Sequence, residues 1–155
     1  MSVFEDFEGF VSALPKGQSL VGLDLGSKTI GVAVSDRLWT VATPRETIKR
    51  KKFSLDAAHV LEILNAVEAG GIVLGLPINM DGSAGPRVQS TRAFAANMSK
   101  QTDLPIGFWD ERLSTIAAER AMLEADMSRA KRAEAIDHVA AGYILQGALD
   151  RIRHL

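Results

Sequence analysis

The chain contains no cysteine, few aromatic residues and no long hydrophobic run. Without thiols it has no disulfides, thiolate metal sites or cysteine nucleophiles, which agrees with a reducing compartment. Aromatic residues make up only 6% of the sequence, which disfavours single-strand binding by base stacking. No apolar stretch reaches the length of a membrane span, and the acidic N-terminal residues do not resemble a signal peptide. We therefore expect a cytoplasmic protein with no membrane partner.

The chain also lacks an excess of positive charge, since its net charge is −1 over 155 residues. A nucleic-acid partner would have to be bound by a local cationic surface or through metal ions. The candidate cationic segments are residues 49–52, 129–132 and 151–153. Each of them, taken alone, is better explained as solvated charge in a loop or at a helix end.

Length and hydrophobic periodicity predict one folded domain of the α/β class. We expect residues 1–18 to be an N-terminal extension with one short helix, and residues 19–155 to form the domain. Ser54 and Ser114 are candidate helix caps, and Pro86 suits a first helical position. The expected strands are 20–25, 30–35, 41–48, 72–76 and 104–109, and the expected helices are 54–67, 86–98, 115–125 and 131–151.

The connections between these elements predict how the sheet is built. The tight turn at residues 26–28 indicates an antiparallel hairpin, and Pro44 indicates an irregularity or an edge position in the third strand. The later strands are linked by helices, which implies parallel crossover connections. The sequence therefore predicts a mixed five-stranded sheet with helices on both faces.

Asp24 closes the first apolar strand and lies on the opposite strand face from its neighbours Leu23 and Leu25. A carboxylate beside buried surface is costly unless it is paired or bound to metal. The alternative is that Asp24 only accepts hydrogen bonds from turn amides, as aspartate often does. The local sequence leaves both interpretations open.

Asp110 and Glu111 follow the fifth strand directly, at the strand end where α/β proteins place ligands. They could instead interact favourably with the dipole of the next helix. Arg112 could pair with one of these acids or bind a phosphate.

Asp137 interrupts a stripe of small and apolar residues in the last helix, which favours a functional role. The alternatives are that Asp137 lies at the edge of the stripe and extends its carboxylate to solvent, or that it pairs with Arg132 or His138.

Three carboxylates from distant parts of the chain suit a hard cation, Mg²⁺ or Mn²⁺. Two such ions can assist hydrolysis of a phosphodiester. Zinc is disfavoured because the three histidines show no ligand spacing.

A polar loop between residues 75 and 87 precedes a helix start, an arrangement suited to phosphate approach. Asn79, Ser83 and Arg87 could donate hydrogen bonds to a nucleic-acid backbone. An ordinary surface loop is the alternative, although its length favours function.

Four segments together resemble the YqgF/RuvX family of ribonuclease-H-fold proteins, which are bacterial relatives of Holliday-junction resolvases described as nucleases of pre-16S rRNA. The resemblance covers about residues 20–149. Its carriers are DLGSKTIGVAVSD from Asp24, GLPINMDG from Gly75, DERLST from Asp110 and AIDHVAAGYIL from Ala135.

This resemblance implies a ribonuclease-H-like sheet of strand order 3-2-1-4-5. It also implies that Asp24, Glu111 and Asp137 are the catalytic acids and hold Mg²⁺ or Mn²⁺. The implied substrate is structured RNA, notably the 5′ end of the small-subunit rRNA precursor, with branched DNA as an alternative and ribosomal particles as further partners. We expect Lys28, Asn79, Arg87 and Arg112 to contact the substrate.

Other functions remain open at this point. The glycine turn after Asp24 also resembles the phosphate hairpin of sugar kinases and actin-like ATPases, but those proteins need two such domains. A non-catalytic RNA-binding maturation factor and a metal-stabilised scaffold without activity are further alternatives. Retention of all three acids favours the nuclease.

Overall fold

A computed structural model describes residues 2–79, 81–113 and 129–155; for residues 129–137 it describes the helical backbone and no side chains. A single mixed sheet carries the fold, with strand order β1-β6-β5-β2-β3-β4. The strands are β1 (Val3–Phe4), β2 (Ser19–Leu25), β3 (Thr29–Ser35), β4 (Ala42–Lys49), β5 (Ala69–Leu76) and β6 (Ile106–Asp110). The helices are α1 (Phe7–Ala13), α2 (Phe53–Ala66), α3 (Pro86–Met98) and α5 (Arg129–Arg153), with a 3₁₀ turn, η1, at Glu111–Leu113.

Strand directions bring most strand ends to one edge of the sheet. β1, β6, β5 and β2 run parallel to one another, whereas β3 is antiparallel to both β2 and β4. β4 therefore runs in the same direction as β2. The carboxyl ends of β2, β4, β5 and β6 and the start of β3 consequently share one edge, which we call the carboxyl edge.

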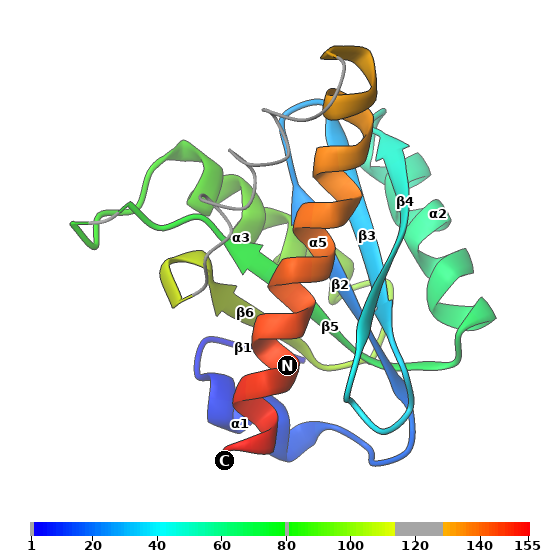
Figure 1. Ribbon diagram of the computed structural model, residues 1–155, viewed down its shortest axis with the longest axis vertical. Coiled ribbons are helices and arrows are strands. Elements are labelled where there is room, and N and C mark those ends of the chain that lie inside the picture. Colours follow the sequence, from blue (N-terminus) through cyan, green and yellow to red (C-terminus); the bar gives the residue numbers. More distant parts are fainter. Residues whose placement is uncertain (1, 80, 114–128) are drawn as a thin grey trace.

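Helices cover both faces of the sheet (Figure 1). α5 crosses one face, where it forms a hydrophobic cluster with α1. α2 and α3 pack on the other face in a second cluster. Both clusters contain side chains of the central strands, which explains why β2 and β5 are buried along their whole length. No helix in the described part of the chain is long and apolar enough to cross a membrane.

The predicted mixed α/β sheet with helices on both faces is confirmed, and its inner five strands follow the expected order. The count of five was wrong, because Val3 and Phe4 add a sixth strand beside β6. This strand and α1 attach residues 2–18 to the same sheet. Phe10 of α1 is fully buried and packs so closely that a Cβ on Gly107 would lie 2.4 Å from its ring.

Other local predictions fared differently. Pro86 opens α3 as expected, and β4 is an edge strand with a register shift next to Pro44. Ser54 does not cap α2, because the helix begins at Phe53. The buried carboxylate of Asp56 instead turns back to accept a hydrogen bond from the Lys51 amide. The predicted cap Ser114 and helix 115–125 lie outside the described residues.

The hairpin between β3 and β4 is held by one carboxylate. Asp36 accepts hydrogen bonds from the backbone amides of Thr40 and Val41 and from the Thr40 hydroxyl. The hydroxyl bond is the largest of the causes that lower the pKa of Asp36 to about 2. The charged form of Asp36 therefore stabilises the folded hairpin.

We expect this hairpin to make stability fall at acidic pH. Because the folded-state pKa lies near 2, below the ordinary value of 3.8, the stabilisation is present above about pH 4 and is lost as the pH falls through 2. Asp36→Asn should weaken folding at pH 7 and flatten the loss between pH 4 and 2, measured by urea unfolding. Asp103→Asn, at an exposed site, should keep the wild-type dependence; equal slopes for all three proteins would contradict the role of Asp36.

Candidate active site at the carboxyl edge

Asp24 ends up buried near the end of β2, with only 3% of its surface exposed. On the same strand, a Cβ on Gly22 would lie 2.8 Å from Leu145 of α5. Since alternate residues of a strand share a face, Asp24 lies on the face that α5 covers. The predicted placement of a carboxylate beside buried surface therefore holds in the structure.

Glu111 approaches the same face from η1, on the β6 side of β5, whereas Asp24 belongs to β2 on the opposite side of β5. Glu111 opens η1 directly after β6, and its Oε2 lies 3.2 Å from the point where a Cβ on Gly75 would sit. A Cβ there would also lie 2.4 Å from Ile144 of α5, so Gly75 faces α5. Continuing the register of β2 and β5, in which Leu23 is opposite Leu74, places Gly75 opposite Asp24. The two acids thus come to adjacent positions beneath α5.

Gly75 is a site residue that the sequence argument did not single out. It lacks the side chain that would displace either the Glu111 carboxylate or α5. A glycine inside an apolar strand is a known sign of close approach by another group, so the signal was present in the run 72–76.

Asp137 belongs to α5, but its side chain lies outside the described part of the structure. Its backbone position is one helical turn before Ala141, whose carbonyl oxygen would lie 3.3 Å from a Cβ on Gly22. The neighbouring His138 contacts the Thr47 hydroxyl of β4 at 2.9 Å through its Nδ1. Among the described residues, no three acidic or histidine side chains gather closely enough to hold a metal ion.

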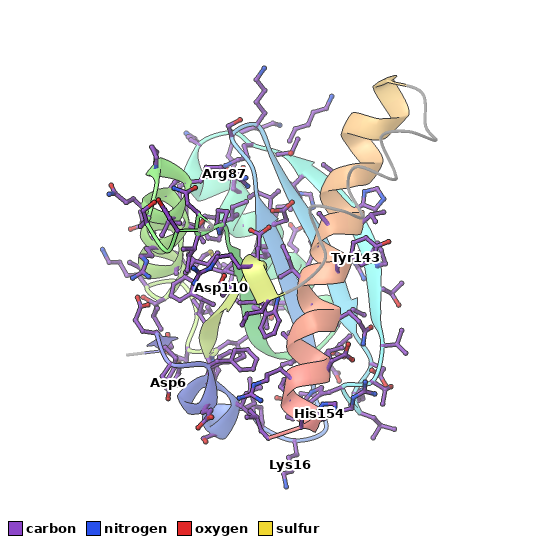
Figure 2. The ribbon with its side chains drawn as sticks, turned by 60° about the vertical axis from the view of Figure 1, so that its left-hand side comes forward. Asp6, Lys16, Arg87, Asp110, Tyr143 and His154 are labelled. Atoms are coloured by element: carbon purple, nitrogen blue, oxygen red, sulfur yellow. The ribbon has the colours of Figure 1, made fainter. Side chains whose placement is uncertain are left out.

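Among the described residues, Arg87 places a basic group beside Asp24. Its Nη2 lies 3.8 Å from Asp24 Oδ1, which is longer than a hydrogen bond, and donates to the Leu25 carbonyl at 3.0 Å. The Arg87 side chain is half exposed. Figure 2 shows it near the carboxyl edge, at the opposite end of the molecule from Asp6, Lys16 and His154. The ion pair partly offsets the buried charge of Asp24 without enclosing it.

Arg112 forms an ion pair with Asp110, one of the two roles that the sequence left open for it. Its Nε and Nη2 donate to both carboxylate oxygens of Asp110 at 2.7–3.1 Å. This interaction lowers the pKa of Asp110 and raises that of Arg112. Asp81 in the neighbouring loop adds a smaller attraction that also raises the pKa of Arg112. The Asp110–Arg112 pair joins the end of β6 to η1, and only the weaker attraction of Asp81 comes from the loop after β5.

Asn79 and Lys28 occupy different surroundings. The Asn79 side chain donates to the Ser83 hydroxyl at 3.0 Å, and its backbone closes the same loop through Ser83 and Gly82. Lys28 is exposed in the β2–β3 turn, and its carbonyl accepts from the Arg50 amide at 2.8 Å. The structure thus brings Asp24, Glu111 and Arg87 together, whereas Asn79 orders its own loop.

Comparisons with known proteins give a family, close relatives in sequence and a similar fold. A family model described as "RuvX: Holliday junction resolvase" matches residues 18–151. A protein of Ruegeria sp. (strain TM1040) named "Putative pre-16S rRNA nuclease" is 69% identical over 153 residues, covering 99% of this chain and 98% of the relative. One of the same name from Roseobacter denitrificans is 67% identical, covering 97% of this chain and 94% of the relative.

Among solved structures, Thermus thermophilus RuvC in complex with Holliday junction substrate superposes with a TM-score of 0.55. The match covers 86% of this chain and 95% of that chain at 13% identity. At this identity the likeness concerns the fold, and it confirms the expected ribonuclease-H-like arrangement.

The space at Gly75 can be tested by filling it. Gly75→Ala places a methyl group against Ile144 and the Glu111 carboxylate, and overpacking of this kind costs about 1–3 kcal/mol. We expect the melting temperature to fall by roughly 2–10 °C. Gly85→Ala is the matched control, because a Cβ there meets no atom closer than 3.8 Å. An unchanged melting temperature for Gly75→Ala would show that α5 does not lie this close to β5.

Proposed function

The chain belongs to the RuvX family of nucleases, and on that premise we propose that it cleaves phosphodiester bonds of the small-subunit rRNA precursor with the help of divalent metal. We assign Asp24, Glu111 and Asp137 as the acids that hold the metal. The relatives named above as nucleases of pre-16S rRNA support this choice of substrate. We further propose that the protein works in the cytoplasm.

The observation that carries the proposal is the buried carboxylate of Asp24 at the carboxyl edge, with Glu111 brought beside it by Gly75. Like charges at adjacent positions repel, and burial adds to their cost unless cations neutralise them. Carboxylate oxygens are the ligands that Mg²⁺ and Mn²⁺ prefer. The two described acids therefore fit such an ion in chemical type and in burial.

A divalent ion in this position supplies a Lewis acid for the phosphate and lowers the pKa of water. The chain's own groups provide the rest. Lys28 is an exposed cation in the glycine turn that follows Asp24, placed to attract a phosphate. Arg112 keeps Asp110 ionised and joins it to η1, so that Glu111 starts from a fixed backbone position.

Arg87 has a separate part in this proposal. Its hydrogen bond goes to the Leu25 carbonyl and not to the Asp24 carboxylate. The guanidinium can therefore balance the acid before metal and substrate arrive, and it can turn towards a phosphate oxygen without losing its anchor.

Cleavage of branched DNA is the second candidate function, because the matching family model is described as a Holliday junction resolvase. The two substrates use the same phosphodiester chemistry. A direct assay on both separates them.

The assay incubates the protein with rRNA precursor or a four-way DNA junction in Mg²⁺, Mn²⁺ or EDTA. We expect cleavage of the precursor in metal and none in EDTA. Asp24→Asn, Glu111→Gln and Asp137→Asn should each lower the rate by about 100-fold or more, the scale of losing one charge-stabilising group. Asp103→Asn, an equal charge change at an exposed site, should cleave at the wild-type rate. Undiminished cleavage by Asp24→Asn would refute the assignment.

Metal binding can be measured apart from cleavage. A ligand at 100 times its Kd stabilises the folded state by about 2.7 kcal/mol, or roughly 5–10 °C for a chain of this size. Titration with Mg²⁺ or Mn²⁺ should raise the melting temperature of the wild type and of Asp103→Asn, but not that of Asp24→Asn. An equal rise in all three proteins would place the ion elsewhere.

A further inference from the structure

Five cationic residues gather at the carboxyl edge where the β2–β3 turn meets the β4–α2 loop. We call them the basic surface: Lys28, Lys49, Arg50, Lys51 and Lys52. Antiparallel pairing sets Thr29 opposite Lys49, and the Arg50 amide donates to the Lys28 carbonyl at 2.8 Å. Charges more than 20 positions apart in the sequence therefore lie side by side.

The backbone beneath these charges is tied down at several points. The Gly26 amide donates to the Thr29 carbonyl at 2.8 Å, closing the turn. The Arg50 guanidinium donates to the Gly26 carbonyl at 2.7 Å, joining the loop to the turn. The Lys51 amide donates to the buried Asp56 carboxylate at 3.0 Å. The basic surface therefore has a defined backbone rather than being a mobile charged run.

The lysines of this surface carry uncompensated charge. Lys28, Lys49, Lys51 and Lys52 are exposed, and none of them forms an ion pair within the residues that the structure describes. Arginines elsewhere are paired, as in Arg37 with Glu68, Arg92 with Glu5 and Arg153 with Asp150. In a chain with a net charge of −1, such a local excess favours a polyanionic partner.

The surface adjoins the proposed cleavage site. Gly26, which Arg50 contacts, is two residues beyond Asp24, about 7 Å along an extended chain. Phosphates on one strand of a double helix rise about 3.4 Å each, so a strand with its scissile phosphate at Asp24 reaches the basic surface within a few nucleotides. None of the large apolar side chains that are well exposed in the described residues is aromatic. The half-buried Phe53 beside Lys52 packs edge-on against Phe94, so the basic surface presents cations rather than well-exposed rings.

We propose that the basic surface binds the phosphate backbone of double-stranded nucleic acid next to the cleavage site. Exposed cations on a fixed backbone, without well-exposed aromatic rings, suit the regular phosphates of a duplex better than the bases of a single strand. This proposal rests on the proposed function, since it takes Asp24 as the point of cleavage. In the sequence alone, residues 49–52 were better explained as solvated charge. The proposal instead makes them part of a nucleic-acid-binding surface.

The test measures affinity in EDTA, where no cleavage occurs, by fluorescence anisotropy with a labelled RNA duplex, a DNA duplex of the same sequence and a single strand of equal length. The variant Lys51→Gln/Lys52→Gln is compared with Lys16→Gln/Lys100→Gln, which removes two exposed lysines elsewhere; Figure 2 shows Lys16 at the opposite end of the molecule from Arg87. Melting temperatures confirm that both variants are folded.

We expect the surface variant to bind duplex about 10- to 100-fold more weakly at 0.1 M salt, with the slope of log affinity against log salt reduced by about 2. The control should match the wild type. Tighter binding of one duplex shows whether the surface prefers RNA or DNA, and equal binding shows that it accepts both. Each of these three results supports the proposal. Tighter binding of the single strand, no duplex binding by the wild type, or a surface variant equal to the control would overturn it.

The binding measurements in EDTA do not depend on whether the protein cleaves its substrate, so they can fail or succeed separately from the nuclease assignment. A reduced slope in the surface variant stands even if metal-dependent cleavage is not found. If the wild type cleaves its substrate but the surface variant has the same salt slope as the wild type, the proposed role of the basic surface is refuted and the nuclease assignment still stands.

Discussion

The close contact of α5 with strands β2 and β5 is the constraint on which the rest of the structure depends. Gly22 and Gly75 have no Cβ, and one added at either position would lie 2.4–2.8 Å from a side chain of α5. Interiors are packed too densely to absorb such an atom without movement. The same contact buries the apolar side of α5 and covers the strand face on which Asp24 and Glu111 lie. Core packing and the site are therefore one arrangement.

The carboxyl edge separates charge by sign over a short stretch of chain. Asp24 lies under α5 within the sheet, whereas the basic surface begins four residues later, at Lys28 in the exposed turn. Buried acids attract cations and an adjoining basic surface attracts phosphates. In the proposed function, the basic surface would therefore hold the polyanion while cations neutralise the acids. A net charge of −1 conceals this division because the two signs nearly cancel over the whole chain.

Much of the fold could be predicted because its signals are local. Apolar runs marked the inner strands, Pro86 marked the start of α3, and Pro44 marked an irregular edge strand. The failures also have local causes. Val3–Phe4 is too short to show alternation, so the sixth strand was missed. The strand predicted at 72–76 begins earlier in the structure, at Ala69, because Gly70 and Gly71 also belong to β5, where Leu14, Pro15 and Gln18 pack against them.

The sequence by itself determined the class of the fold, the acidic residues that strand ends and a helix face could present, and the order of motifs that indicates the family. Tertiary structure alone decided that Gly75 makes room for Glu111, that Arg87 approaches Asp24 while bonded to Leu25, and that Arg50 binds the turn at Gly26. Each of these contacts joins residues more than 20 positions apart. They depend on strand order and register, which local propensities do not contain because they arise only when the whole sheet pairs.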